Sequence, residues 1–383
     1  MGSRIKLKNK VLFITLRIFS VTGGIEKVCK LAGKALYELG MQYGGLIKIH
    51  SMYGPKGKAD GNKYFPQLIF TGFSGHRINC VLKSIREGRR SRVVLLSHIN
   101  LLIIGYLIKL IKPSVKLVML AHGIEVWYPL SSWKKKMLHK CDLILPVSHF
   151  TRDKLISQHG IPKERLVVIN NCLDPFMEQP LNKEKSPALM NRYGLKGNET
   201  ILLTVSRIGN TERDKGYDKV LQALPELIAE NPGIRYLMVG NYTVKEKQRL
   251  NELIRQLGLE QVVIFTGIIP DELMATHFKL SDIFVMPSRK EGFGIVFIEA
   301  MFYGLPVIGG NKDGSTDALC NGELGILVDP NDVNGLVKAV EEVMANRSRY
   351  VPDNNKLMQH FGYTGYKQQL DHCLNNLLQE AHL

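Results

Sequence analysis

The sequence predicts an α/β protein with two Rossmann-like domains, each built on a parallel sheet. Short runs of Val, Ile and Leu alternate with amphipathic stretches along the chain, a pattern typical of parallel sheets covered on both faces. These runs form two series, one in each half. The length of 383 residues also suits two domains of about 150–200 residues, each with its own core.

The first half contains the first series of expected elements. Val11–Thr15 has the composition of a buried strand, and Gly23-Gly24 then leads into a helix over Ile25–Leu39 with its apolar residues on one face. The longest apolar stretch, Leu101–Ile111, includes Lys109 and is too short to span a bilayer. Further strands are expected at Val93–Leu96, Leu117–Leu120, Leu143–Pro146 and Val167–Ile169.

The second half repeats the rhythm after an exposed connection. The boundary is expected within Asp174–Pro187, which holds three prolines and mixed charges. We therefore assign residues 1–175 to a first domain, 176–360 to a second and 361–383 to a final helical segment. The last helix itself is expected to begin near Asn355, before that segment, and to end near Glu380. Strands are expected at Ile201–Val205, Tyr236–Val239, Val262–Thr266, Ile283–Met286, Val307–Ile308 and Ile326–Val328.

Positive charge is concentrated in the first half. Residues 1–175 have 29 Lys and Arg against 9 Asp and Glu, or +20, and the remainder has 22 against 26, or −4. Such a basic half suggests a phosphate-rich partner, either nucleic acid or anionic lipid. The six cysteines are scattered without a Cys-x-x-Cys pair, which argues against a metal knuckle and fits a cytoplasmic protein.

The segment Glu291–Glu299 is the most informative part of the chain. The apolar run before it predicts a strand that ends at Pro287, and a loop with Glu291, Gly292, Phe293 and Gly294 then precedes a helix that contains Glu299. The amides at a helix N-terminus bind anions such as phosphates, whereas the two carboxylates can accept hydrogen bonds from hydroxyl groups. A nucleotide sugar offers both groups.

Cations that could neutralise a diphosphate follow an earlier strand of the second half. Arg207 lies just after Ile201–Val205, and Lys215 lies at the far end of the same polar loop, with Arg213 as a rival. No two aspartates are two positions apart, so the Asp-x-Asp metal motif is absent. We therefore expect neutralisation by the protein and no metal or other cofactor.

The two glutamates are poorly spaced for glycoside hydrolysis. Retaining and inverting glycosidases place their carboxyls about 5–5.5 Å and about 6.5–9.5 Å apart. Eight residues at helical rise span about 12 Å, and Glu291 precedes the helix. The pair suits the two ends of a long donor better than one glycosidic bond.

Together these motifs resemble the Glu-x7-Glu signature of the retaining glycosyltransferases of family four, which have the GT-B fold. The resemblance runs from Gly23-Gly24 to Leu327–Pro330. It implies two Rossmann-like domains with parallel sheets that face a central cleft, and a final helix that crosses back to the first domain. It also implies metal-independent transfer of a hexosyl unit with retention of the anomeric configuration.

The resemblance also suggests roles for residues of the second domain. Glu291 would contact the sugar hydroxyls and Glu299 the ribose. The loop Gly292, Phe293 and Gly294 would place its amides near the sugar and the phosphates.

Five further residues carry roles by the same resemblance. Arg207 and Lys215 would grip the diphosphate, Gly23 and Gly24 resemble the family's glycine loop, and His122 resembles the histidine that faces the reaction centre. Gly23-Gly24 is not a Gly-x-Gly-x-x-Gly motif, so a nicotinamide site is poorly supported.

The chain departs from the family pattern at three places. Asn171 and Asp174 match the family's hinge, but Asn170 and Cys172 replace its Pro and Gly. Asp313–Asp317 stands where Gly-Gly-x-x-Glu is common, and Phe302-Tyr303 replaces small residues. These changes put the contacts to the base or sugar in doubt.

We therefore expect a transferase that uses a nucleotide-diphosphate sugar and a glycan or lipid-linked glycan acceptor, as in bacterial surface polysaccharide synthesis. The basic clusters Lys83–Arg92 and Trp133–Lys140 favour an anionic membrane surface, and so a cytoplasmic protein peripheral to the inner face of the cell membrane. A phosphorylase or epimerase on the same fold remains an alternative. A nucleic-acid-binding protein is disfavoured, because no recognised nucleic-acid motif occurs.

Overall fold

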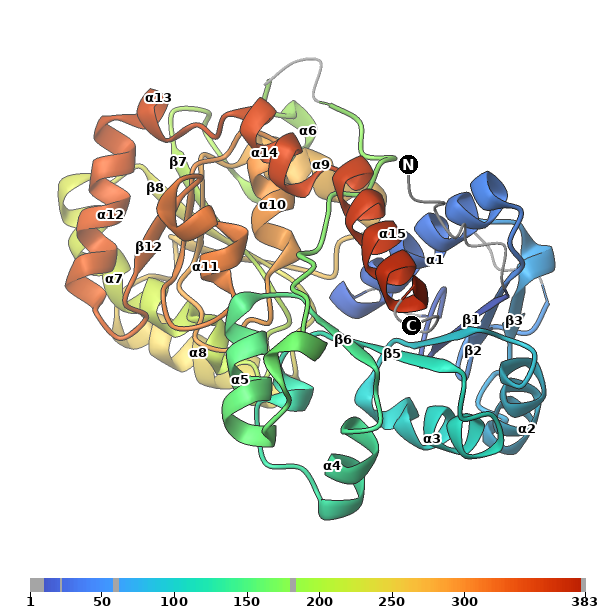
Figure 1. Cartoon of the computed structure of the whole chain (residues 1–383). Helices are drawn as coiled ribbons and strands as arrows, with labels where there is room; N and C mark the ends of the chain where they lie inside the picture. The colour runs from blue at the N-terminus through green and yellow to red at the C-terminus, as the bar shows by residue number, and fades with distance from the viewer. Residues whose placement is uncertain (1–9, 21–22, 58–61, 180–183, 380–383) are drawn as a thin grey trace. The chain divides into compact units, whose positions relative to one another are not determined.

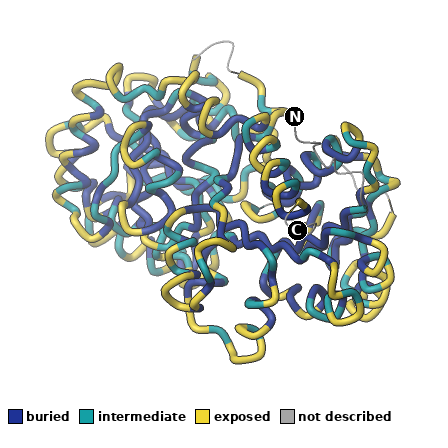
Figure 2. Tube along the Cα trace, in the orientation of Figure 1, coloured by how far each residue is buried: buried dark blue, intermediate teal, exposed yellow. Residues whose placement is uncertain are grey.

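The computed structural model describes residues 10–20, 23–57, 62–179 and 184–379 (Figure 1). The chain divides into two compact units. The first consists of Met1–Pro175 together with Phe361–Leu383, and the second of Phe176–His360. Most strands of the two units are buried, whereas every residue of Val263–Gly267 is only partly buried (Figure 2); buried strands are expected for sheets covered on both faces.

The first unit contains a six-stranded parallel sheet with the order β3-β2-β1-β4-β5-β6. Because the order reverses direction beside β1, polar loops gather at the carboxyl ends of the central strands. The strands are β1 (Val11–Thr15), β2 (Ile47–Ser51), β3 (Phe70–Gly72), β4 (Val93–Leu96), β5 (Lys116–Ala121) and β6 (Leu143–Pro146).

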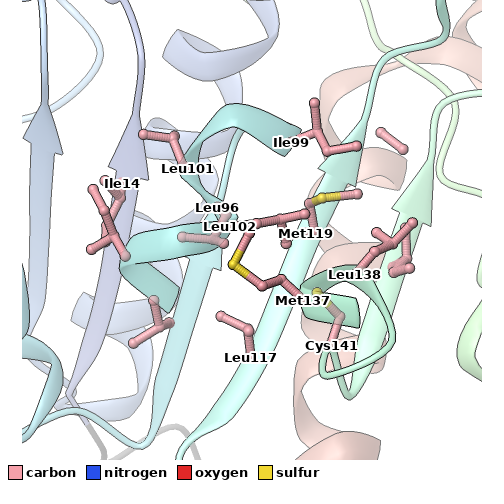
Figure 3. Packing of buried hydrophobic residues seen from close by; sticks show 14 of the residues in the cluster. Ile14, Leu96, Ile99, Leu101, Leu102, Leu117, Met119, Met137, Leu138 and Cys141 are labelled. Carbon is pink, nitrogen blue, oxygen red and sulfur yellow. The ribbon is translucent and has the colours of Figure 1, made fainter. Parts of the chain in front are cut away.

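Helices cover this sheet, and one core lies under α2, α3 and α4. Leu102 and Ile108 of α3 and Leu138 of α4 pack against Leu96 and Met119 of the strands; several of these side chains are labelled in Figure 3. The helices are α1 (Gly24–Tyr43), α2 (Arg77–Gly88), α3 (Leu102–Ile111), α4 (Ser132–Leu138), α5 (His149–His159) and α15 (Tyr363–Gln379).

The helix α15 packs against α1 of the first unit, although the contacting residues Glu38 and Tyr363 are 325 positions apart in the sequence. Glu38 accepts hydrogen bonds from Tyr363 (3.1 Å) and Lys367 (2.9 Å), and Tyr43 donates one to Asp371 (2.7 Å). These polar contacts flank buried apolar side chains of both helices, and so they fix the register of α15 on α1.

The second unit has a parallel sheet of the same size, with the order β12-β11-β10-β7-β8-β9. The two sheets confirm the expected α/β class. The strands are β7 (Thr200–Val205), β8 (Ile234–Val239), β9 (Val263–Gly267), β10 (Ile283–Met286), β11 (Val307–Gly310) and β12 (Ile326–Val328). The helices include α6 (Pro187–Tyr193), α7 (Tyr217–Glu230), α8 (Val244–Gln256), α9 (Asp271–Leu280), α10 (Ile295–Phe302), α11 (Ser315–Ala318), α12 (Val333–Ala345), α13 (Arg347–Tyr350) and α14 (Asn354–Phe361).

One expected strand is wrong. The segment Val167–Ile169 runs beside β6, with Val167 N–H donating to Ile144 O (3.2 Å) and Ile169 N–H to Pro146 O (3.0 Å). Pro146 has no N–H with which to return a bond, so the ladder does not extend. Only an isolated bridge, Ile144 with Leu166, is formed.

The expected single final helix is also wrong, because the structure has two. α14 ends at Phe361 and α15 begins at Tyr363. Gly362 stands between them, and glycine is a poor helix former. The two helices divide between the compact units at this point. Residues 380–383 of the expected helix lie outside the described part.

Candidate functional site

The loop between β10 and α10 forms the centre of the candidate site in the second unit. Gly294 is the N-cap of α10 and has φ +87°, a left-handed conformation that favours glycine. A Cβ atom there would lie 2.3 Å from Cδ2 of Phe297. Phe293 is buried and anchors the loop. The first amides of α10 have no acceptor within the helix, and so they can bind an anion.

Lys215 and Glu291 meet beside this loop. Lys215 Nζ lies 2.5 Å from Glu291 Oε2, and both side chains are mostly buried. Burial disfavours the ammonium, but the Glu291 carboxylate outweighs it and raises the pKa of Lys215. The pair therefore sets one cation and one carboxylate next to each other at a polar, partly exposed corner.

A glycine makes this approach possible. Gly216 follows Lys215 and has φ +83°, and a Cβ atom there would lie 2.3 Å from the carbonyl oxygen of Pro287. Any larger residue would separate the Lys215 loop from the loop that carries Glu291. Gly216 therefore couples the two segments, which are far apart in the sequence.

Lys215 and Arg213, the two candidate cations of this loop, have different carboxylate partners in the structure. Arg213 binds the buried Glu246 through Nε (3.1 Å) and Nη2 (2.9 Å), whereas Lys215 binds Glu291. Arg207 is highly exposed and lies 2.8 Å from Glu212 Oε1. Glu299 is partly buried within α10.

Asp313 supports the Glu291 loop, a role that the sequence reasoning missed. Its Oδ2 accepts hydrogen bonds from Ser288 Oγ (2.8 Å) and Glu291 N–H (2.6 Å), and its Oδ1 accepts one from Ser315 N–H (2.9 Å). Gly314 N–H donates to Glu291 O (2.8 Å). The sequence signal for this role is a carboxylate in the loop that follows the strand at Val307–Ile308, although Asp313 there marks only a departure from the family pattern.

The protonation of Asp313 is expected to affect the site. Burial raises its pKa to about 6, against the opposing hydrogen bonds from Ser315. Below that pH the carboxyl is protonated and has fewer acceptor positions for Ser288 and for the Glu291 amide.

We therefore expect kcat/KM of the reaction at this site to fall as the pH drops through about 6. Asp313→Asn, which is permanently neutral, should lower kcat/KM above about pH 6, where the parent carboxyl is charged, and remove this limb. Profiles of kcat/KM against pH for both proteins test this. A parent profile that stays flat through pH 6, or a variant that keeps the limb, would contradict the supporting role.

The first unit holds a second polar group, at the carboxyl ends of β4 and β5. His122 Nε2 lies 2.7 Å from the carbonyl oxygen of Ser97, and the backbone N–H of His122 donates to Glu125 Oε1 (2.6 Å). Burial lowers the pKa of His122 to about 4, so the imidazole is neutral at pH 7 and donates to Ser97. His98 lies in the same group, and burial lowers its pKa too.

The two glycines after β1 are only partly constrained. A Cβ atom on Gly23 would lie 2.6 Å from Glu26 Oε2, whereas one on Gly24 would meet nothing within 4 Å. In the described part of the chain, nothing therefore crowds the first residue of α1, Gly24. Among the described residues, no three His, Cys, Asp or Glu side chains are grouped so that they could hold a metal ion.

Two family models match consecutive parts of the chain. The model described as Glycosyltransferase Family 4 matches residues 22–175, and the model described as Glycosyl transferases group 1 matches residues 185–368. The matches leave only residues 176–184 between them, and so they follow the two compact units.

Curated relatives are similar over part of their length. A GDP-mannose-dependent alpha-(1-6)-phosphatidylinositol monomannoside mannosyltransferase from Mycolicibacterium smegmatis is 30% identical over 61% of this chain, which spans 62% of that relative. A mannosylfructose-phosphate synthase from Agrobacterium fabrum is 26% identical over 62% of this chain and 55% of the relative.

Solved structures share the fold along almost the whole chain. A glycosyltransferase from Rickettsia africae has a TM-score of 0.75 at 18% identity, covering 96% of this chain and 99% of that one. Anabaena HepE in complex with UDP has a TM-score of 0.73 at 20% identity, covering 96% and 100%. The likeness along almost the whole chain confirms the expected GT-B fold.

Proposed function

Because this chain belongs to the family 4 glycosyltransferases, we propose that it transfers a hexosyl unit from a nucleotide-diphosphate sugar to a glycan or lipid-linked glycan acceptor. The observation that carries the proposal is the Lys215–Glu291 pair beside the N-terminus of α10. A cation and free amides suit the diphosphate, and a carboxylate suits the sugar hydroxyls.

Each residue has a distinct part in the proposed reaction. Lys215, Arg207 and the first amides of α10 stabilise the charge that grows on the diphosphate as it leaves. Glu291 accepts hydrogen bonds from the sugar, and Glu299 accepts them from the ribose. By the family resemblance we also assign His122 to the sugar; because its Nε2–H is donated to Ser97, its Nδ1 is left to accept a hydrogen bond from a hydroxyl.

The proposed chemistry retains the configuration at the anomeric carbon and uses no metal. The bond from that carbon to the diphosphate oxygen breaks, and a bond to the acceptor oxygen forms on the same face. The acceptor's proton goes to the departing diphosphate. The charge that a metal would neutralise is met by the cations and amides of the second unit.

Incubation with labelled nucleotide sugars and a series of acceptors tests the function. We expect release of the nucleoside diphosphate together with a labelled product of unchanged anomeric configuration, with and without chelator. An inverted product would contradict retention, and activity restored only by a divalent ion would contradict metal independence. Phosphate-dependent release or epimerised donor would instead indicate the phosphorylase or the epimerase.

Arg207→Ala is expected to weaken binding of the nucleoside diphosphate by about 1.5–3 kcal/mol, the usual range for a lost charged hydrogen bond. The exposed position of Arg207 favours the lower end, because solvent screens the charge. Calorimetric titration with UDP and GDP measures the loss. Arg255→Ala is the matched control, since Arg255 is also an exposed arginine in an ion pair with a glutamate. Equal affinity in the parent and Arg207→Ala would remove Arg207 from the site.

For the acceptor we propose a lipid-linked sugar in bacterial surface polysaccharide assembly, reached at the inner face of the cell membrane. The +20 charge of residues 1–175 supports an anionic surface. The Mycolicibacterium relative acts, by its name, on a phosphatidylinositol monomannoside, and the Agrobacterium relative makes a sugar phosphate. Parallel assays with a lipid-linked and a soluble sugar phosphate acceptor distinguish these classes.

A further inference from the structure

The helix α3 has apolar side chains around its whole circumference, although only one side is buried. Leu102, Ile104 and Ile108 pack into the core of the first unit. On the outer side, Ile103 and Leu110 are 42% and 60% exposed. A helix that is apolar all round is typical of one enclosed by protein or in contact with lipid, so this outer side is unusual for a surface in water.

The neighbouring helix α2 combines exposed apolar and basic side chains. Ile78 and Leu82 are one helical turn apart and are 75% and 61% exposed. Lys83 and Arg86 are exposed on the same helix, and Arg90 follows it; the three are spaced so that they share one side. Glu87 is the only acid in α2, and it is paired with Lys10.

The helix α4, on the other side of α3, has a similar composition. Trp133 is 55% exposed, and Lys134 Nζ lies 5.8 Å from the centre of its ring. Lys135, Lys136 and Lys140 are exposed. An exposed tryptophan among lysines is typical of side chains that lie at a membrane interface.

The three helices lie on one face of the sheet. α3 packs against both α2 and α4, and Cys80, Ile108 and Leu138 of the three helices join one core with Leu96 and Met119 (Figure 3). Figure 1 shows α2, α3 and α4 along the same side of the unit. Their outer sides therefore form one continuous surface, which we call the α2–α4 face.

We infer that the α2–α4 face docks on an anionic phospholipid surface, with Ile78, Leu82, Ile103, Leu110 and Trp133 entering the interface and the basic residues contacting lipid phosphates. The inference rests on the proposed function for its purpose, since a lipid-linked acceptor would be met there. A second copy of this chain does not suit the face, because two such basic surfaces would repel each other. Nucleic acid would leave the aliphatic side chains exposed.

The docked protein would lie on the membrane and not cross it. Within the part of the chain that the structure describes, no helix is long and apolar enough to span a bilayer. The ten residues of α3 extend about 15 Å, or half of the hydrocarbon core. Amphipathic surface helices bury their apolar side about 5–10 Å deep and bind more tightly to anionic lipids.

Sedimentation with phosphatidylcholine vesicles, with and without phosphatidylglycerol, tests the inference on the whole chain. We expect binding only with phosphatidylglycerol and weaker binding at high salt. Lys83→Gln, Arg86→Gln and Arg90→Gln together should lower the partition coefficient about a hundredfold, at about fivefold per charge. Lys196→Gln, Lys245→Gln and Lys338→Gln, exposed lysines of the second unit, form the matched control and should change it little.

A second readout follows the apolar contacts. The chain has two tryptophans, and Trp127 is buried, so a blue shift of tryptophan emission on vesicles should disappear in Trp133→Phe. Leu110→Ser should weaken binding about tenfold, and Val244→Ser, at an even more exposed apolar site of the second unit, should not. No binding, equal binding to both vesicles, or equal losses in the control variants would overturn the docking face.

The vesicle-binding experiment can fail or succeed independently of the sugar-transfer experiment. Sugar transfer in a protein that does not bind phosphatidylglycerol vesicles would overturn the docking face alone. Vesicle binding without turnover of any nucleotide sugar would overturn the proposed transfer and leave the docking face.

Discussion

Replacing Glu291 with Gln is expected to reduce kcat by on the order of a hundredfold or more, comparable to the loss of a polar group that acts on a transition state. The side chain lies beside Lys215 and the amides of α10. The amide keeps the volume of the carboxylate but loses its charge and one acceptor. The fold should persist, because Glu291 is partly exposed at a loop. Single-turnover kinetics measure the change, and circular dichroism checks the fold.

The pairing with Lys215 makes a double-mutant cycle necessary. Glu291→Gln removes the partner of a mostly buried ammonium, which by itself alters Lys215. Lys215→Met and the double variant separate this coupling from the direct role of Glu291. A Glu291→Gln enzyme with unchanged kcat would exclude it from the chemistry. Glu299→Ala should reduce kcat similarly, and unchanged nucleotide affinity in that variant would contradict its ribose contact.

Glu246→Ala is expected to lower the free energy of unfolding by about 3–5 kcal/mol, as when one member of a buried ion pair is removed. Glu246 is fully buried and pairs with Arg213 (2.9 Å) and Arg249 (2.6 Å). Tyr217 also donates to it (3.1 Å). Its loss removes the carboxylate from Arg213 and leaves Arg249 with only Asp218 (2.7 Å), and it loosens the segment that carries Lys215. Urea unfolding measures the loss.

Glu252→Ala on the same helix is the control for Glu246→Ala. Glu252 is half exposed and pairs with Arg255, so its loss should cost no more than about 1 kcal/mol. Equal effects of the two substitutions would contradict a special role for the buried network.

The Glu246 network should also give a pH dependence. Burial works against the charged carboxylate, but the hydrogen bonds from Arg249 and Arg213 outweigh burial and lower its pKa to about 2. With a lower pKa in the folded than in the unfolded state, its stabilisation is present above pH 4.5 and is lost as the pH falls through about 2. Glu246→Ala should lack this component of acid unfolding.

The sequence alone predicted the elements whose composition leaves little choice. The strands β1, β4, β6, β10 and β12 have the expected bounds, because short runs of Val, Ile and Leu suit only a strand that is buried on both faces. Glu291 and Gly294 were placed correctly in a loop before a helix, since glycine and an apolar period of 3.6 mark such a boundary. The spacing of the two glutamates carried the family resemblance.

The tertiary structure decided which charges meet. Arg213 and Lys215 lie in the same loop, but Arg213 pairs with Glu246, 33 positions away, and Lys215 pairs with Glu291, 76 positions away. The same holds for Asp313, whose hydrogen bonds to Ser288 and to the Glu291 amide form only when two loops are brought together by the sheet.

The sequence alone also did not determine which segments pair as strands or which side chains are exposed. Val167–Ile169 has the composition of a strand, but its neighbour Pro146 cannot return a hydrogen bond. From the sequence, the apolar run of α3 was predicted only to be too short to span a bilayer. The structure shows which of its side chains are exposed and that α2 and α4 lie on either side of it. Local composition fixes the elements, whereas contacts between distant segments determine which side chains are paired, buried or exposed.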